Sequence, residues 1–292
     1  MVKRLLPLRG KYIEIKHGIN LHYLDVGSGE PVVMLHGNPS WSFYYRNLAL
    51  AMTPTHRVIV PDHIGCGLSD KPDDSEYRYT LDQRVADLET LLESIGVEDN
   101  ITLVVHDWGG MIGMRFATLH PHRIKKIVAM NTAAFPLPRS KKLPFALKLG
   151  RESRIGTVLI RGFNAFSAAA AWVGCKQNPM PKALRHCYTA PYNSWRNRIA
   201  TLRFVQDIPL TPADPAYQSV AEVEDNLSAL EHLPIMVCWG EQDFVFDRHF
   251  LQQWRVKFPL ARFHTWAQGG HYILEDVTEE IIPLICDFIR EN

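Results

Sequence analysis

The stretch Val104-Val105-His106-Asp107-Trp108-Gly109-Gly110 places an aspartate between an apolar run and a pair of glycines. The pattern predicts a strand that runs into a sharp turn and then a helix, with Asp107 at the apex. Such a nucleophile elbow usually presents serine. A carboxylate, with a reference pKa near ~3.9, is ionised at neutral pH and needs no base to become a nucleophile. The alternative role for Asp107 is to cap the following helix.

The composition is that of a globular enzyme. The chain has 292 residues, 46% hydrophobic and 22% charged, with a net charge of +1. This balance argues against nucleic acid as a partner. The five cysteines are scattered without a CxxC pair, which predicts reduced thiols and a cytoplasmic location. The N-terminal apolar run is too short for a signal peptide, and no transmembrane segment is predicted.

Short apolar runs bounded by turn signals recur along the chain and alternate with helical patterns. Runs of this kind are typical of buried parallel strands. The alternation predicts the α/β class, with a mostly parallel sheet covered by helices on both faces. Strands are expected near 11–15, 20–26, 31–35, 57–61, 101–105, 126–130, 235–239 and 262–265, and helices near 43–52, 81–95, 111–119 and 278–291.

The alternation stops between residues 134 and 220, where helical patterns, near 145–148 and 163–172, appear without a convincing buried strand. Open α/β sheets bind ligands at the carboxyl edge of their strands. We therefore predict a core formed by residues 1–133 and 221–292, with 134–220 inserted as a helical cap over that edge. A helical excursion without contact to a site is the alternative.

Two later residues are expected to join the nucleophile. His271 lies in a glycine-rich loop near the C-terminus, and Asp243 follows a late apolar run. The order nucleophile, acid, histidine is one of the known triad orders, and the acid would hold the imidazole in one tautomer. Glu241 and Asp247 are competing acids. Asn131, after the preceding strand, carries no charge and is a weak candidate.

Donors for a negative charge are expected from the sequence His36-Gly37-Asn38-Pro39 and from Trp108. The backbone N–H groups of Asn38 and Trp108 would face the site, and the Asn38 amide and Trp108 indole would add side-chain donors. One donor of this kind contributes ~2.7–4 kcal/mol to an acyl-transfer transition state. The alternatives are a turn role for Asn38 and core packing for Trp108.

The glycine-rich loop at 61–72 lacks the spacing of a phosphate-binding loop, so we interpret it as a structural turn beside the elbow. No His, Cys or Asp spacing resembles a metal site. His36, His63 and His106 are expected to be structural. We expect the protein to use neither a metal nor another cofactor.

These motifs together resemble the haloalkane dehalogenase branch of the α/β-hydrolases over nearly the whole chain. The resemblance rests on His-Gly-Asn-Pro at 36–39, Gly-Cys-Gly-Leu-Ser-Asp-Lys-Pro at 65–72 and His-Asp-Trp-Gly-Gly at 106–110. It implies an α/β-hydrolase fold with Asp107 as nucleophile, His271 as base and Asp243 as acid. Asn38 and Trp108 would then bind the leaving group.

A closer resemblance is to the β-lactone decarboxylases of bacterial long-chain olefin biosynthesis. It rests on residues 61–69, 131–136, 161–167 and 203–210, several of them in the expected cap. It implies conversion of cis-3,4-dialkyl β-lactones to cis-alkenes and CO2. The implied partners are a small hydrophobic substrate and other enzymes of the olefin pathway.

Three other functions stay open. Haloalkane dehalogenation would use the same triad. Epoxide hydrolases share His-Asp-Trp-Gly but use two cap tyrosines, for which Tyr188, Tyr192 and Tyr217 are available. A non-catalytic receptor for a hydrophobic ligand would not need a complete triad. The basic and apolar stretch at 141–149 could face a membrane-adjacent partner, although a solvated cap helix is the preferred interpretation.

Overall fold

The computed structural model describes residues 2–16 and 18–291. Its centre is an eight-stranded sheet in the order β1-β2-β4-β3-β5-β6-β7-β8. The six strands from β4 to β8 in that order run parallel, whereas β2 pairs antiparallel with both β1 and β4. The strands are β1 (Gly10–Lys16), β2 (Ile19–Val26), β3 (Pro31–Leu35), β4 (Arg57–Pro61), β5 (Ile101–Asp107), β6 (Ile124–Thr132), β7 (Ile235–Gly240) and β8 (Arg262–Trp266).

Alternate residues of the central strands belong to two different apolar clusters, one on each face of the sheet. On β5, Leu103 and Val105 pack on one face while Val104 packs on the other. Strands buried on both faces read as continuous apolar runs, which is why the sequence shows runs rather than polar–apolar alternation. The α/β prediction and the mostly parallel sheet are confirmed.

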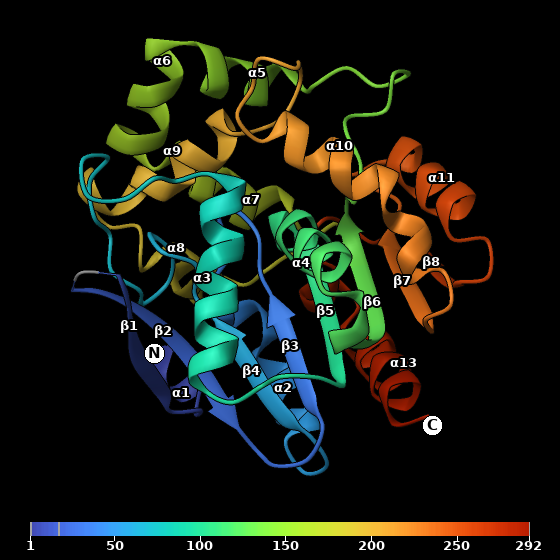
Figure 1. The fold of residues 1–292 in the computed structure, drawn as a ribbon. Coiled ribbons are helices and arrows are strands. Elements are labelled where there is room, and N and C mark those ends of the chain that lie inside the picture. Colours follow the sequence, from blue (N-terminus) through green and yellow to red (C-terminus); the bar gives the residue numbers. More distant parts are fainter. Residues whose placement is uncertain (1, 17, 292) are drawn as a thin grey trace.

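Helices cover both faces (Figure 1). The first face carries α3 (Leu81–Ser94), α4 (Trp108–Leu119), α10 (Tyr217–Asp225) and α11 (Arg248–Lys257), and the second carries α2 (Arg46–Met52), α12 (Ile273–Asp276) and α13 (Thr278–Arg290). A short helix, α1 (Val2–Leu5), precedes β1. The helix expected at 43–52 is in fact a 3-10 turn at Ser42–Tyr45 followed by α2.

Strand β5 and helix α4 meet without a loop. β5 was expected to end at Val105, but its pairing with β6 continues until Asp107 lies opposite Thr132. Helix α4 was expected from Met111 and begins at Trp108. The apolar pattern underestimated the length of both elements, because His106, Asp107, Gly109 and Gly110 are polar or lack a side chain although strand and helix continue through them.

The segment 134–220 contributes no strand to the described structure. Its helices are α5 (Phe145–Glu152), α6 (Arg154–Thr157), a π-helical turn (Val158–Gly162), α7 (Ala165–Val173), α8 (Lys182–Thr189) and α9 (Ile199–Gln206), followed by α10. In Figure 1, α5, α6 and α9 lie beyond the arrowhead of β6, where the parallel strands end. Among the helices described, none is both long and apolar enough to cross a bilayer.

Candidate active site

The turn at Asp107 is strained in the way a nucleophile elbow requires. Asp107 has φ 52° and ψ −127°, a conformation that L-residues rarely adopt. A Cβ on Gly109 would lie 1.9 Å from the Leu35 carbonyl oxygen, and one on Gly110 would lie 1.7 Å from Thr132 Oγ1. Only glycine fits at these two positions. The Asp107 side chain makes no cap hydrogen bond, so the helix-cap alternative is wrong.

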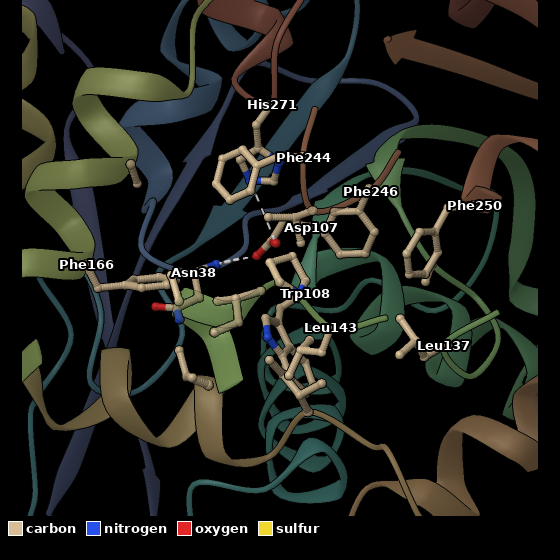
Figure 2. A pocket seen from close by; sticks show the side chains of 18 of the residues that line it. Asn38, Asp107, Trp108, Leu137, Leu143, Phe166, Phe244, Phe246, Phe250 and His271 are labelled. Carbon is tan, nitrogen blue, oxygen red and sulfur yellow. Dashed lines mark hydrogen bonds and ion pairs between the residues drawn. The ribbon is translucent and has the colours of Figure 1, made fainter. Parts of the chain in front are cut away.

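The structure brings Asp107, His271 and Asp243 together. His271 Nε2 lies 3.8 Å from Asp107 Oδ2, and His271 Nδ1 lies 2.7 Å from Asp243 Oδ2. All three residues are buried. Of the competing acids, Asp247 pairs with Lys141 instead, while Glu241 is exposed. The contact to Asp243 fixes which imidazole nitrogen faces Asp107. Figure 2 marks the approach of His271 to Asp107 with a dashed line.

Asn131 has a role that sequence reasoning missed. Its Nδ2 donates to Asp243 Oδ2 at 3.1 Å and to the Gly240 carbonyl at 3.0 Å, while its Oδ1 accepts from Gly240 N at 2.8 Å. Residue type indicates only a weak replacement acid at this position, whereas the Asn131 amide holds the end of β7 and orients Asp243. The second oxygen of Asp243 accepts from Val245 N at 2.7 Å. The sequence signal that could have revealed this role is the position of Asn131 directly after a central strand.

His106 holds the backbone of His271. Its Nε2 lies 2.8 Å from the His271 carbonyl oxygen, and its ring packs 4.7 Å from the His271 ring. Because the carbonyl can only accept, Nε2 carries the proton. Burial and the neighbouring His271 lower the pKa of His106 well below its usual range. A neutral, structural histidine at this position agrees with its expected role.

Burial sets the electrostatics of Asp107. It raises the pKa of Asp107 to about 6, against the lowering effect of His271 and of the Trp108 and Asn38 backbone amides. For His271, burial lowers the pKa, but the charge and hydrogen bond of Asp243 and the charge of Asp107 outweigh it and leave the pKa raised. Near neutral pH the site therefore holds an ionised carboxylate beside a readily protonated imidazole.

The backbone N–H of Asn38 points at Asp107. It donates to Asp107 Oδ1 at 2.5 Å. The side-chain Nδ2 donates to the Thr201 carbonyl in α9 at 3.1 Å, which ties the residue to the inserted segment. An amide nitrogen has two N–H donors, so one remains for a ligand.

Trp108 presents a free donor to the same space. Four other tryptophans, Trp41, Trp239, Trp254 and Trp266, each donate their indole N–H to a protein acceptor. No hydrogen bond found within residues 2–16 and 18–291 uses the indole of Trp108, although the residue is 4% exposed. Its ring packs on Phe204 at 5.3 Å between centroids. Together with Asn38, it supplies neutral donors beside the carboxylate.

A cavity of about 1140 Å³, counting the open space at its mouth, contains Asp107, His271, Asn38 and Trp108. Figure 2 shows these four around the carboxylate, with aromatic and aliphatic side chains beyond them. The wall is formed by both the core and the inserted segment and is overwhelmingly apolar. It includes Phe135, Leu137, Leu143, Leu147, Phe166, Val173, Val205, Ile208, Phe246 and Phe250.

The residues that line the cavity include a lysine, Lys141. Its Nζ lies 2.7 Å from Asp247 Oδ2 and donates to the Phe244 carbonyl at 3.2 Å. The side chain is only 7% exposed, so this residue does not belong to a solvated helix face. Its charge is compensated by Asp247, and the cavity therefore selects for apolar ligand surface.

The candidate tyrosines of an epoxide hydrolase lie elsewhere. Tyr188 donates to Glu275, and Tyr192 donates to the Ser40 carbonyl at 3.0 Å. Neither residue, nor Tyr217, is among the residues that line the cavity. No tyrosine hydroxyl is therefore placed to protonate an epoxide oxygen in the part of the chain described.

A family model described as alpha/beta hydrolase fold matches residues 30–277. The chain belongs to the α/β-hydrolase fold family. The fold expected from the elbow is thus confirmed, together with its family.

Two relatives of this α/β-hydrolase are named cis-3-alkyl-4-alkyloxetan-2-one decarboxylase. One, from Shewanella oneidensis, is 58% identical over 100% of this chain and 92% of its own length. The other, from Xanthomonas campestris pv. campestris, is 47% identical over 97% of this chain and 96% of its own length. A haloalkane dehalogenase from Psychrobacter cryohalolentis is 31% identical over 94% of this chain and 88% of its own. The resemblance to both groups is confirmed.

Proposed function

We propose that this α/β-hydrolase converts cis-3-alkyl-4-alkyl β-lactones to cis-alkenes and CO2 in olefin biosynthesis. The observation that carries the proposal is the 58% identity to a protein named as such a decarboxylase, over the whole chain. The site supports it, because an aspartate nucleophile and neutral donors open into a large apolar cavity. Residues 134–220 act as the cap that shapes this cavity.

In the first step Asp107 attacks the strained four-membered ring. Attack at the ring carbon that bears oxygen forms an alkyl–aspartyl ester, breaks the carbon–oxygen bond and leaves a free carboxylate. Attack at the carbonyl carbon gives a mixed anhydride and an alkoxide instead. In both cases negative charge develops on a substrate oxygen, and Asn38 and Trp108 supply donors for it. Such a hydrogen bond to a charged acceptor contributes roughly 1.5–3 kcal/mol.

Of the two routes we propose the one through the alkyl–aspartyl ester, and this ester then breaks down without water. The bond between the carboxylate and the neighbouring carbon, C3 of the former ring, breaks, and its electron pair forms the alkene with the carbon that is bonded to Asp107. The bond between the substrate carbon and the Asp107 oxygen breaks at the same time. Its electron pair stays on the oxygen, so Asp107 leaves as a carboxylate. Atoms and charge balance without a cofactor. His271, held by Asp243, balances the charge of Asp107 as it is consumed and restored.

Haloalkane dehalogenation is the second candidate, because it uses the same carboxylate, donors and imidazole. Asp107 would displace halide, and His271 would activate water to hydrolyse the ester. The non-catalytic receptor has least support, since the three triad members lie in contact.

The proposal includes a cytoplasmic location, in keeping with five buried free cysteines, and association with other enzymes of the olefin pathway.

A paired assay tests the function. Purified protein is offered a cis-dialkyl β-lactone and, separately, a bromoalkane of matched chain length, and alkene and bromide are measured. We expect alkene formation from the lactone at least ~100-fold faster than bromide release. Rapid bromide release without alkene would replace the proposal with the second candidate.

The pH dependence separates the two chemistries. Alkene formation needs ionised Asp107, so we expect kcat/KM for the lactone to fall tenfold per pH unit below about 6 and to level off above it. Hydrolysis of an ester also needs neutral His271, whose pKa is raised above its usual 6.5, so steady-state bromide release would lose activity at a higher pH. A lactone profile that stays flat down to pH 5 would contradict the assignment of Asp107.

A further inference from the structure

The inserted segment carries a charge that the whole chain does not. The chain has 32 Lys and Arg against 31 Asp and Glu. Residues 134–220 contain 13 Lys and Arg and only three acidic residues, Glu152, Asp207 and Asp214. The rest of the molecule is therefore acidic. A cationic segment on an acidic body gives the protein an electrostatic orientation toward an anionic partner.

Four of the six cations between residues 139 and 154 are exposed. Arg139, Lys142, Lys148 and Arg154 all lie at the surface. None of the four takes part in an ion pair among residues 2–16 and 18–291, in contrast to Arg151 and Lys141, which are paired with acidic residues. Their charge is available to a partner.

Large apolar side chains are exposed among these cations. Phe145 is 79% exposed, Phe163 74% and Ile155 66%, and Val158 and Leu159 are also exposed. They belong to α5, α6, the π-helical turn and the residue after it, which pack on one another in sequence. We call residues 139–163 the outer face. It lies at the top of Figure 1, opposite the C-terminal helix α13.

The outer face adjoins the cavity. Phe145 stands between Pro144 and Ala146, both of which line the cavity, and Ala146 is also exposed. Exposed Phe244, from the core, lines the cavity as well. The cavity therefore opens beside side chains that mix apolar bulk with positive charge, a combination typical of surfaces that insert into the headgroup region of a bilayer.

We propose that the outer face docks on an anionic lipid bilayer, so that the cavity opens toward the acyl chains. The reason for docking rests on the proposed function, because a lactone with two long alkyl chains partitions into membranes. The cations would bind anionic headgroups, and Phe145, Ile155 and Phe163 would enter the interface. No transfer of substrate through water is then needed.

Vesicle sedimentation tests the charge part of the proposal. The full-length protein is mixed with vesicles of phosphatidylglycerol and phosphatidylcholine or of phosphatidylcholine alone. We expect binding to the anionic vesicles only, with at least ~10-fold weakening at high salt. The double variant Lys142→Glu/Lys148→Glu should lose at least ~10-fold in affinity. The matched control Arg9→Glu/Arg255→Glu, exposed on the core, should keep it.

The contribution of the exposed apolar side chains to vesicle binding is tested with a second pair of variants. Phe145→Ser/Phe163→Ser should weaken vesicle binding at least ~10-fold, while Val256→Ser/Leu260→Ser, on core residues 61% and 90% exposed, should not. All variants should retain activity on a short-chain, water-soluble lactone. The proposal is overturned if the protein does not bind anionic vesicles, or if the control variants lose as much binding as the test variants. The outer face would then fit an acidic protein as its partner instead. Binding without alkene formation would instead overturn the proposed function alone.

Discussion

Replacing Asp107 by glycine is expected to abolish alkene formation and to stabilise the fold. Loss of a nucleophile costs at least ~10⁴-fold in kcat. A non-glycine residue held at φ 52° stores strain of about 1–3 kcal/mol, which glycine relieves. The Asp107→Ala variant removes the carboxylate but keeps the strain. We therefore expect both variants to be inactive and the glycine variant to have the higher Tm.

A matched control separates strain relief from chemistry. Asn100 also has a positive φ, 53°, and is exposed. The Asn100→Gly variant should have a higher Tm than the unchanged protein and keep full activity. Activity is measured as alkene released from the lactone, and stability by thermal unfolding. Alkene formation by either Asp107 variant would refute the nucleophile assignment.

Replacing Gly37, in the loop after β3, by alanine is expected to disable the site. A Cβ at this position would lie 1.9 Å from Asp107 Oδ1 and 2.5 Å from its Cγ. The carboxylate would have to move and lose the hydrogen bond from Asn38 N. A displacement of about 1 Å in a catalytic group can cost ~10²-fold in rate, so we expect kcat/KM for the lactone to fall by at least that factor.

The control for this prediction is Gly162→Ala. Its new Cβ would meet its nearest neighbours at 3.7 and 3.8 Å, which are ordinary contacts. Near-wild-type activity is expected there, together with retained folding in both variants by circular dichroism. If Gly37→Ala kept full activity while folded, the tight packing of the loop against Asp107 would be wrong.

The fold and the meeting of Asp107, Asp243 and His271 could be predicted because each rests on local pattern. Val104 and Val105 indicate a buried strand, and the two glycines after Trp108 indicate a turn that has no room for side chains. The position of Asp243 followed from chain order after a late strand. The expected strands differ from those observed mainly at their ends, where pairing continues beyond the apolar residues.

What the sequence did not reveal depends on contacts between distant segments. Asn131 orients Asp243 through an amide that only the approach of β6 to β7 makes useful. Asn38 donates a side-chain hydrogen bond to Thr201, 163 residues away. The pairing of Lys141 with Asp247 buries a lysine that the sequence placed on a solvated helix. Residue type alone does not specify such partners.

The central claim is that Asp107 forms a carbon–oxygen ester that breaks down by losing CO2 rather than by reacting with water. The most direct measurement is the mass of the peptide that contains Asp107 after many turnovers of the lactone in H₂¹⁸O. Elimination returns the original carboxylate oxygens, so we predict no mass increase. A gain of one ¹⁸O at Asp107, which hydrolysis of an aspartyl ester would produce, contradicts the account.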